Sequence, residues 1–190
     1  MILDLIRHAD TGRRGHLDGR TDPPLLPGAL APVLRRHEGL CWRHIVTSPL
    51  IRARVTAEAL SESMGVPVDV DQRWSELDFG SWDGLPSAEL DPDALADFHS
   101  NPRLHGPPDG EGWDDFGERV HAGLVDIVAR PGPVLVVSHA ATLRMALALA
   151  CGLPFPTSWA IRIDYGTRLR LSVEDGPTGL WGEIVELVQP

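Results

Sequence analysis

Residues 2–11 read ILDLIRHADT and place a short apolar run directly before Arg7 and His8. A second apolar run, at 134–137, opens the stretch VLVVSHAATLR, where His139 follows almost at once. Short apolar runs of this kind predict strands buried on both faces, as in a parallel sheet covered by helices. Because the carboxyl ends of parallel strands meet at one edge of a sheet, we expect the two histidines to face one crevice.

Apolar runs alternate with helical patterns along the whole chain, which predicts an α/β fold. The expected architecture is a three-layer α/β/α sandwich with a mostly parallel central sheet. The expected strands are 2–6, 45–47, 134–137 and further strands within 159–188, divided at Asp175-Gly176-Pro177. The expected helices are about 30–37, 48–64, 88–98, one that starts at Trp113, and 140–150. We expect residues 1–190 to form a single domain, with an insertion at about 74–112 that covers the substrate pocket.

The charge balance limits the partners of this protein. Among 190 residues, 17 are Lys or Arg and 27 are Asp or Glu, which gives a net charge of -10. Binding the phosphate backbone of a nucleic acid needs a broad basic surface. No segment approaches the ~20 apolar residues of a membrane span, and the first residues lack a signal-peptide pattern. We therefore expect a cytoplasmic protein with no nucleic-acid or membrane partner, and the assembly stays open between a monomer and a homodimer.

Several other classes of site lack their motifs. Cys41 and Cys151 stand far apart without CxxC or histidine spacing, so we expect two buried thiols and no zinc site or disulfide. No HExxH motif is present, and arginines beside the histidines would repel a metal cation. The GEG stretch at 110–112 lacks the third glycine of a dinucleotide fingerprint, and no GxSxG nucleophile elbow exists.

Arginines next to the strand-end histidines indicate an anionic substrate. Arg7 precedes His8, and Arg52 lies at the start of the helix that follows strand 45–47. A guanidinium presents a planar fork of donors that matches phosphate oxygens in pairs. Phosphoryl transfer to an imidazole needs a neutral ring, cationic groups around the phosphate and an acid for the leaving oxygen. Nearby arginines favour the neutral ring.

The acid is expected in the stretch RWSELDFGSWDG, residues 73–84. Glu76 is one candidate, and Asp78 and Asp83 are competitors. The apolar neighbours of Glu76 are Trp74, Leu77 and Phe79. These side chains would partly desolvate its carboxyl and favour the protonated acid. Spacing alone does not choose among the three carboxyl groups.

Four segments together resemble the histidine phosphatase superfamily, which has the phosphoglycerate mutase-like fold. In chain order they are LIRHADT (5–11), SPLIRARVTA (48–57), SELDFGSWDG (75–84) and VLVVSHAATLR (134–144). The resemblance covers nearly the whole chain. It implies that His8 is the nucleophile that becomes phosphohistidine and that Arg7, Arg52 and His139 form the phosphate pocket. It also implies that Glu76 is the acid.

The chain departs from the family at the glycine after the first histidine, which is Ala9 here, and at the glycine pair after the second histidine, which is Ala140-Ala141. Alanine is small enough for backbone donors to reach a phosphate, so we expect Ala140 to contact substrate. The family's asparagine after the first motif has no match. We expect substrate contacts in this loop from Thr11, Arg14 and Arg20 instead.

Within the family, the chain most resembles alpha-ribazole phosphatases and other small phosphomonoesterases, through PPDGEGWDDFGERV at 107–120 and its compact length. The resemblance implies hydrolysis of a small phosphate ester without a metal or other cofactor. Alpha-ribazole 5'-phosphate, from cobalamin biosynthesis, is the named candidate substrate. The alternatives are a phosphoglycerate mutase-type phosphotransferase and a non-catalytic phosphate-binding protein.

Overall fold

A six-stranded sheet forms the centre of the molecule in the computed structural model, which describes residues 1–177 and 179–190. Its strands, in the order β3-β2-β4-β1-β5-β6, are mostly parallel, because β1 to β4 run in one direction and β5 runs against them. The bounds are β1 (Ile2–Arg7), β2 (His44–Thr47), β3 (Val68–Val70), β4 (Val134–Ser138), β5 (Arg168–Gly176) and β6 (Gly179–Val188). The predicted α/β sandwich is confirmed.

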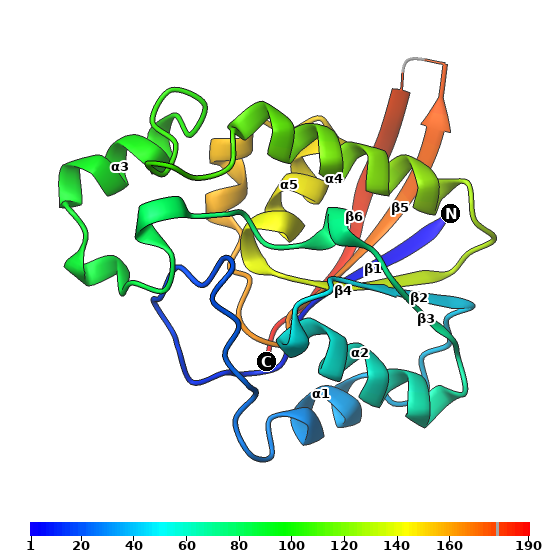
Figure 1. The fold of residues 1–190 in the computed structure, drawn as a ribbon. Helices are drawn as coiled ribbons and strands as arrows, with labels where there is room; N and C mark the ends of the chain where they lie inside the picture. The colour runs from blue at the N-terminus through cyan, green and yellow to red at the C-terminus, as the bar shows by residue number, and fades with distance from the viewer. Residues whose placement is uncertain (178) are drawn as a thin grey trace.

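Helices cover both faces of this sheet (Figure 1). On one face lie α1 (Leu30–Arg36) and α2 (Ile51–Met64), and on the other lie α4 (Trp113–Val128) and α5 (Ala140–Cys151). Each face has its own apolar core, and successive residues of β1 serve opposite sides: Leu5 packs in one cluster and Ile6 in the other. This follows from the alternation of side chains along a strand. Within the described residues, no helix has both the length and the apolar character needed to cross a membrane.

The segment between β3 and α4 is irregular and lies beside one end of the sheet. It contains α3 (Pro92–Ser100) and the short 3₁₀ turns η1 (Gln72–Trp74), η2 (Gly80–Trp82) and η3 (Ser87–Glu89); a fourth turn, η4 (Phe155–Ala160), follows α5. The helix expected at 88–98 begins later, at Pro92. Asp91 ends the preceding extended stretch, because a residue before proline disfavours helical backbone, and its side chain accepts a hydrogen bond from the Asp93 amide.

Two further expectations differ from the structure. Strand β3 was not predicted, because three residues with one polar side chain in the middle offer too little pattern to read. In the C-terminal region, only residues 168–176 and 179–188 form the expected strands.

The two cysteines are not the buried thiols that we expected. Cys41 is exposed and Cys151 is only partly buried. Cys41 lies in the turn before β2, where the neighbouring Trp42 takes the inward position and is 4% exposed. A larger apolar side chain thus excludes the thiol from the core at this turn.

Candidate active site

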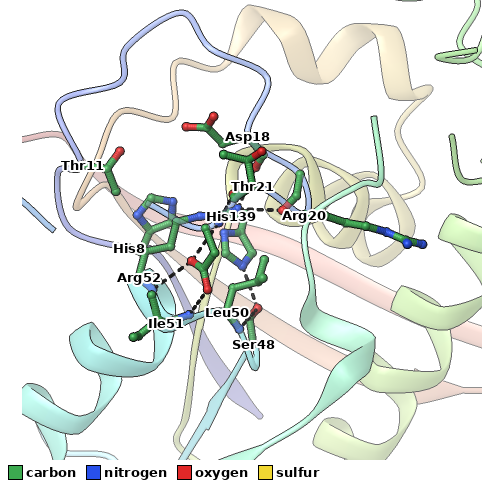
Figure 2. Close-up of polar contacts among 12 residues, drawn as sticks. His8, Thr11, Asp18, Arg20, Thr21, Ser48, Leu50, Ile51, Arg52 and His139 are labelled. Atoms are coloured by element: carbon green, nitrogen blue, oxygen red, sulfur yellow. Dashed lines mark hydrogen bonds and ion pairs between the residues drawn. The ribbon is translucent and has the colours of Figure 1, made fainter. Parts of the chain in front are cut away.

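The two strand-end histidines lie side by side at the carboxyl edge of the sheet. Strands β1 and β4 pair in parallel, with Arg7 opposite Ser138. His8 and His139 follow directly, and their ring centroids are 5.1 Å apart (Figure 2). The register between the two strands therefore brings together two residues that are far apart in the sequence.

A cavity of about 130 Å³ opens beside His8. Six of the residues predicted to act in catalysis or binding line it: Arg7, His8, Thr11, Arg52, Glu76 and Ala140. His139 lies behind His8, is 1% exposed and is not among the lining residues. A cavity of this size suits a small ligand rather than a large one.

His8 has one free ring nitrogen. Its Nδ1 lies 2.8 Å from the carbonyl oxygen of Ala9, and a carbonyl only accepts, so Nδ1 carries the proton. This bond leaves the lone pair on Nε2. Burial, followed by the charges of Arg7 and Arg52, lowers the pKa of His8 well below its ordinary value. The imidazole is therefore neutral at neutral pH and able to act as a nucleophile.

His139 is held from behind by a serine. Its Nε2 lies 2.7 Å from Oγ of Ser48, which also accepts a hydrogen bond from the Leu50 amide (Figure 2). Its Nδ1 is buried and has no partner in the described part of the chain. Burial, followed by the charge of Arg52, lowers the pKa of His139 well below the usual range. This ring is also neutral, with one nitrogen free for an incoming group.

Arg7 has donors left for a ligand. Its Nη1 donates to the carbonyl of Ile163 at 2.8 Å, and its guanidinium stacks 3.9 Å from the centre of the Tyr165 ring. Its Nε is buried without a partner. The hydroxyl of Tyr165 in turn lies 3.0 Å from Oγ1 of Thr11, which positions the ring. Arg7 is thus oriented by the protein while most of its donors stay unused.

We expected the guanidinium of Arg52 to bind phosphate oxygens through paired hydrogen bonds, but most of its donors have other partners. Its two terminal nitrogens donate to the carbonyls of Asp18, Gly19 and Thr21 and to a carboxyl oxygen of Asp22, at 2.7–3.1 Å. Only Nε–H is left for a ligand. The guanidinium therefore connects the loop after β1 to helix α2. Its contribution to a ligand in the cavity is mainly its positive charge, because four of its five N–H donors bind the loop.

The start of α2 is shifted by the same loop. The sequence predicted a start at Ser48, but the helix begins at Ile51, whose amide donates to Asp22 at 2.6 Å (Figure 2). Asp22 thus caps a helix from a distant part of the chain.

Glu76 reaches the N-terminus of α5. Its Oε1 accepts from the amides of Leu77 and Thr142, at 3.0–3.1 Å. The Thr142 hydroxyl lies 3.0 Å from the same oxygen, but its one proton has a shorter bond, of 2.7 Å, to the carbonyl of Ser75. Oε2 of Glu76 accepts from the Ala141 amide alone, at 3.1 Å. The apolar neighbours are buried as expected, but they do not surround the carboxyl, because these donors face it.

The two competing carboxyl groups have other partners. Asp83 accepts from the amides of Gly19, Arg20 and Thr21 at 2.8–2.9 Å and so shapes the loop. Asp78 pairs with Arg20 at 2.6 Å. Neither lines the cavity, whereas Glu76 does.

Arg14 and Arg20 are not brought to the cavity. The Arg14 side chain is 60% exposed and lies near Asp10 and Asp164, at 3.8 and 4.0 Å. The Arg20 side chain is 80% exposed, and Figure 2 shows it directed away from the histidines. The short loop is tied to Arg52 and Asp83, which leaves these two arginines outside the pocket.

Most of the aromatic lining of the cavity was not predicted from the sequence. Besides Phe79, already named beside Glu76, it comes from separate segments: Phe98, Trp113, Phe155, Trp159 and Tyr165. His16, His99 and Arg144 also line the cavity. Arg144 had a readable signal, because it lies four residues after Ala140 on one helix face. The aromatic residues had none, since only the tertiary fold gathers them.

The family model for the histidine phosphatase superfamily (branch 1) matches residues 3–180, and the chain belongs to this family. It is accordingly a phosphatase, a phosphoric monoester hydrolase of the phosphoglycerate mutase-like class.

Some of the similar proteins are named as phosphatases and others as phosphoglycerate mutases. The chain is 32% identical over 171 residues, 85% of its length and 84% of the other protein, to "Putative phosphoserine phosphatase 2" of Hydrogenobacter thermophilus. It is 30% identical to "Probable phosphoglycerate mutase GpmB" of Klebsiella pneumoniae in an alignment of 197 positions, which covers 96% of this chain and 89% of the other protein. The alpha-ribazole phosphatase structure from Shigella flexneri matches with a TM-score of 0.79 at 23% identity, covering 97% and 95% of the chains. At that identity the likeness shows a common fold.

Proposed function

We propose that this protein hydrolyses a small phosphate monoester through a phosphohistidine on His8, without a metal ion. The observation that carries this proposal is the hydrogen bond from His8 Nδ1 to Ala9, which leaves the Nε2 lone pair as the nucleophile. The ring lines the cavity together with Arg7 and Glu76. A protein that only binds phosphate has no need for both a nucleophile and an acid in one cavity.

In the first step, Nε2 of neutral His8 forms a bond to phosphorus while the ester P–O bond breaks. The bonding electron pair leaves with the alkoxide oxygen, and Glu76 in its acid form gives that oxygen a proton. Oε2 is the better site for this proton, because it accepts from one amide whereas Oε1 accepts from two.

Charge on the transferring phosphoryl group is stabilised by fixed donors. They are the unused donors of Arg7, Nε–H of Arg52, the N-terminus of α5 at Ala140, and Nδ1–H of His139 in the tautomer in which the Ser48 hydroxyl donates to Nε2. Donors held in place before the reaction stabilise a transition state without reorganising. Cationic side chains thus take the place that metal ions fill in other phosphoryl-transfer enzymes.

In the second step, water attacks the phosphohistidine. The Nε2–P bond breaks, its electron pair returns to His8, and the water proton passes to the Glu76 carboxylate. Inorganic phosphate leaves, and both residues regain their first state. A mutase would use the same phosphohistidine and differ only in passing the phosphoryl group to a second hydroxyl.

Phosphate release from a substrate panel tests this function. The panel holds 4-nitrophenyl phosphate, alpha-ribazole 5'-phosphate, phosphoserine, 3-phosphoglycerate and sugar monophosphates. We expect release by the wild type and a loss of at least about 10⁴-fold in His8→Ala, since the nucleophile is gone. Wild-type-like turnover by folded His8→Ala would end the covalent mechanism, and conversion of 3-phosphoglycerate to its isomer without release would indicate a mutase.

The role of Glu76 is tested with Glu76→Gln. We expect a loss of about 10²- to 10⁴-fold on alkyl phosphates and a much smaller loss on 4-nitrophenyl phosphate, whose good leaving group needs no proton. The measurement is kcat/KM for both substrates, which reports formation of the phosphohistidine and not its hydrolysis, a step in which Glu76 serves every substrate alike. Equal losses on the two substrates would contradict the assignment of Glu76 as the acid.

A further inference from the structure

The segment from Trp159 to Tyr165 binds two arginine side chains from other parts of the chain, Arg7 and Arg144, in the same way. Arg7 stacks on the Tyr165 ring at 3.9 Å and donates to the carbonyl of Ile163 at 2.8 Å. Arg144 lies 4.8 Å from the centre of the Trp159 ring and donates to the carbonyl of Ile161 at 3.1 Å. Two guanidinium groups are thus held by alternate carbonyls and by aromatic rings of one segment.

Arg144 forms no ion pair in the described part of the chain, although the charge of Glu76 acts on it from a distance and raises its pKa. Hydrogen bonds to Ala140 and Ile161 use two of its five N–H donors, and its Nε is buried without a partner. Burial, followed by the charge of Arg7, lowers the pKa of Arg144 to about 10. The group is therefore a cation at neutral pH, and its donors and charge are not fully compensated by the protein.

Arg144 lines the same cavity as Arg7. Its platform Trp159 contacts His99 and Phe155, with ring centroids 4.7 and 5.5 Å apart, and all of these residues line the cavity. The carbonyls that hold Arg7 and Arg144 are two residues apart, which an extended chain spans in at most about 7 Å. The second guanidinium lies within reach of the body of an ester whose phosphate is at Arg7.

We propose that Arg144 binds a second anionic group, carried by the leaving group of the substrate. The substrate class is then small phosphomonoesters with a carboxylate or a second phosphate within about 7 Å of the transferred phosphate. This proposal rests on the proposed function, and it disfavours alpha-ribazole 5'-phosphate, whose leaving group carries no anion. Arg144 acts here as a specificity-determining residue.

Matched esters test this assignment. The set is 3-(phosphonooxy)propanoate, its neutral carboxamide, and propane-1,3-diol bisphosphate. We expect the wild type to prefer one of the two anionic esters over the carboxamide by about 10- to 100-fold in kcat/KM, the range of a charge-assisted hydrogen bond. The carboxylate and bisphosphate arms show which anion fits.

Arg144→Met removes the charge and keeps an unbranched side chain against Trp159. We expect it to reduce the preference to about one, through KM of the anionic ester, while the carboxamide stays within about threefold of the wild type. Arg144→Lys is expected to restore part of the preference. The matched control is Arg162→Met, an arginine of the same segment whose side chain is 74% exposed and outside the cavity lining; it should change none of these values.

Two results would overturn the assignment. One is a wild-type preference near one, and the other is an equal loss in Arg144→Met on all esters, which would place Arg144 on the transferred phosphate. Either can occur while His8-dependent release from 4-nitrophenyl phosphate persists, so failure of this inference is distinct from failure of the proposed function. Calorimetric binding of 4-phosphonobutanoate and its amide, which cannot be hydrolysed, gives the same comparison without turnover.

Discussion

Two buried charge clusters lie along β1, and they differ in how their charges are balanced. The sheet cluster is centred on Asp4, which is 0% exposed and accepts from Arg168, Arg170 and the Trp42 indole at 2.6–3.0 Å. Both carboxylate oxygens of Asp4 accept two hydrogen bonds each. The site cluster, at the end of the same strand, consists of Arg7, His8, Arg52, Glu76 and His139. There Arg7 forms no ion pair with a carboxylate in the part of the chain that the structure describes, and one nitrogen each of Arg7 and His139 is buried without a hydrogen-bond partner.

The difference separates a structural role from a functional one. A buried charge is costly unless it is paired with an opposite charge. Nε of Arg168 is buried without a hydrogen-bond partner among the described residues, but every charge of the sheet cluster is paired, so that cluster meets the condition. The site cluster does not, and its two histidines stay neutral because the arginines and burial disfavour a further positive charge. A phosphate dianion is the group that would complete it. Incomplete charge balance beside a cavity, rather than buried charge as such, therefore indicates the active site.

The largest effect on stability is expected from the sheet cluster. Asp4→Asn removes the buried carboxylate that Arg168 and Arg170 share and leaves Arg168 with only its exposed partner Glu186, and we expect it to lower the free energy of unfolding by about 3–5 kcal/mol. Urea denaturation measures this, and kcat of the folded fraction should not change. The control is Glu186→Gln, which removes the 46% exposed partner of Arg168 and should cost at most about 1 kcal/mol. A small loss in Asp4→Asn would break the contrast between the clusters.

A smaller effect is expected from acid on the site cluster. The pKa of His8 and of His139 lies below the ordinary value of 6.5 in the folded chain, because of burial first and then the arginines. Below about pH 6.5 the unfolded chain binds protons that the folded chain does not. The free energy of unfolding should therefore fall as the pH falls from about 6.5 towards the lowered folded-state values. Urea denaturation between about pH 5 and 8 measures this.

The share of this pH dependence that comes from His8 can be measured separately. His8→Ala removes one of the two histidines, so its free energy of unfolding should depend less steeply on pH than that of the wild type. Identical slopes for the two proteins would show that His8 is not protonated on unfolding, against the charge balance described above.

The smallest effect is expected from removal of metal ions. Within the described residues, no three His, Cys, Asp or Glu side chains gather into a site that could hold a metal. We therefore expect kcat/KM to stay within about twofold after incubation with EDTA. The assay is phosphate release with and without the chelator. A large loss that Mg²⁺ or Zn²⁺ restores would show that the side-chain cations are insufficient.

Much of the fold could be predicted because its signals are local. The apolar runs of β1 and β4 and the helical spacing of α4 each lie within one short window. The helix boundaries were harder to predict. The start of α2 depends on Asp22 from a distant loop, and β3 exists because β2 offers it a parallel partner.

The candidate site also has features that the sequence predicts and features that only the tertiary structure decides. The sequence by itself determined the chemical groups. Strand ends and the start of the second helix single out Arg7, His8, Arg52 and His139, whereas Glu76 is chosen from three carboxyl groups only by the resemblance to the histidine phosphatase family. Tertiary structure alone decided how those groups are used. It turns the Arg52 fork towards a loop, directs the Glu76 carboxyl to the N-terminus of α5, and leaves Arg144 unpaired against Trp159. The physical reason is range: a strand end is encoded by its neighbours in sequence, whereas the partners of a buried charge come from wherever the fold brings them.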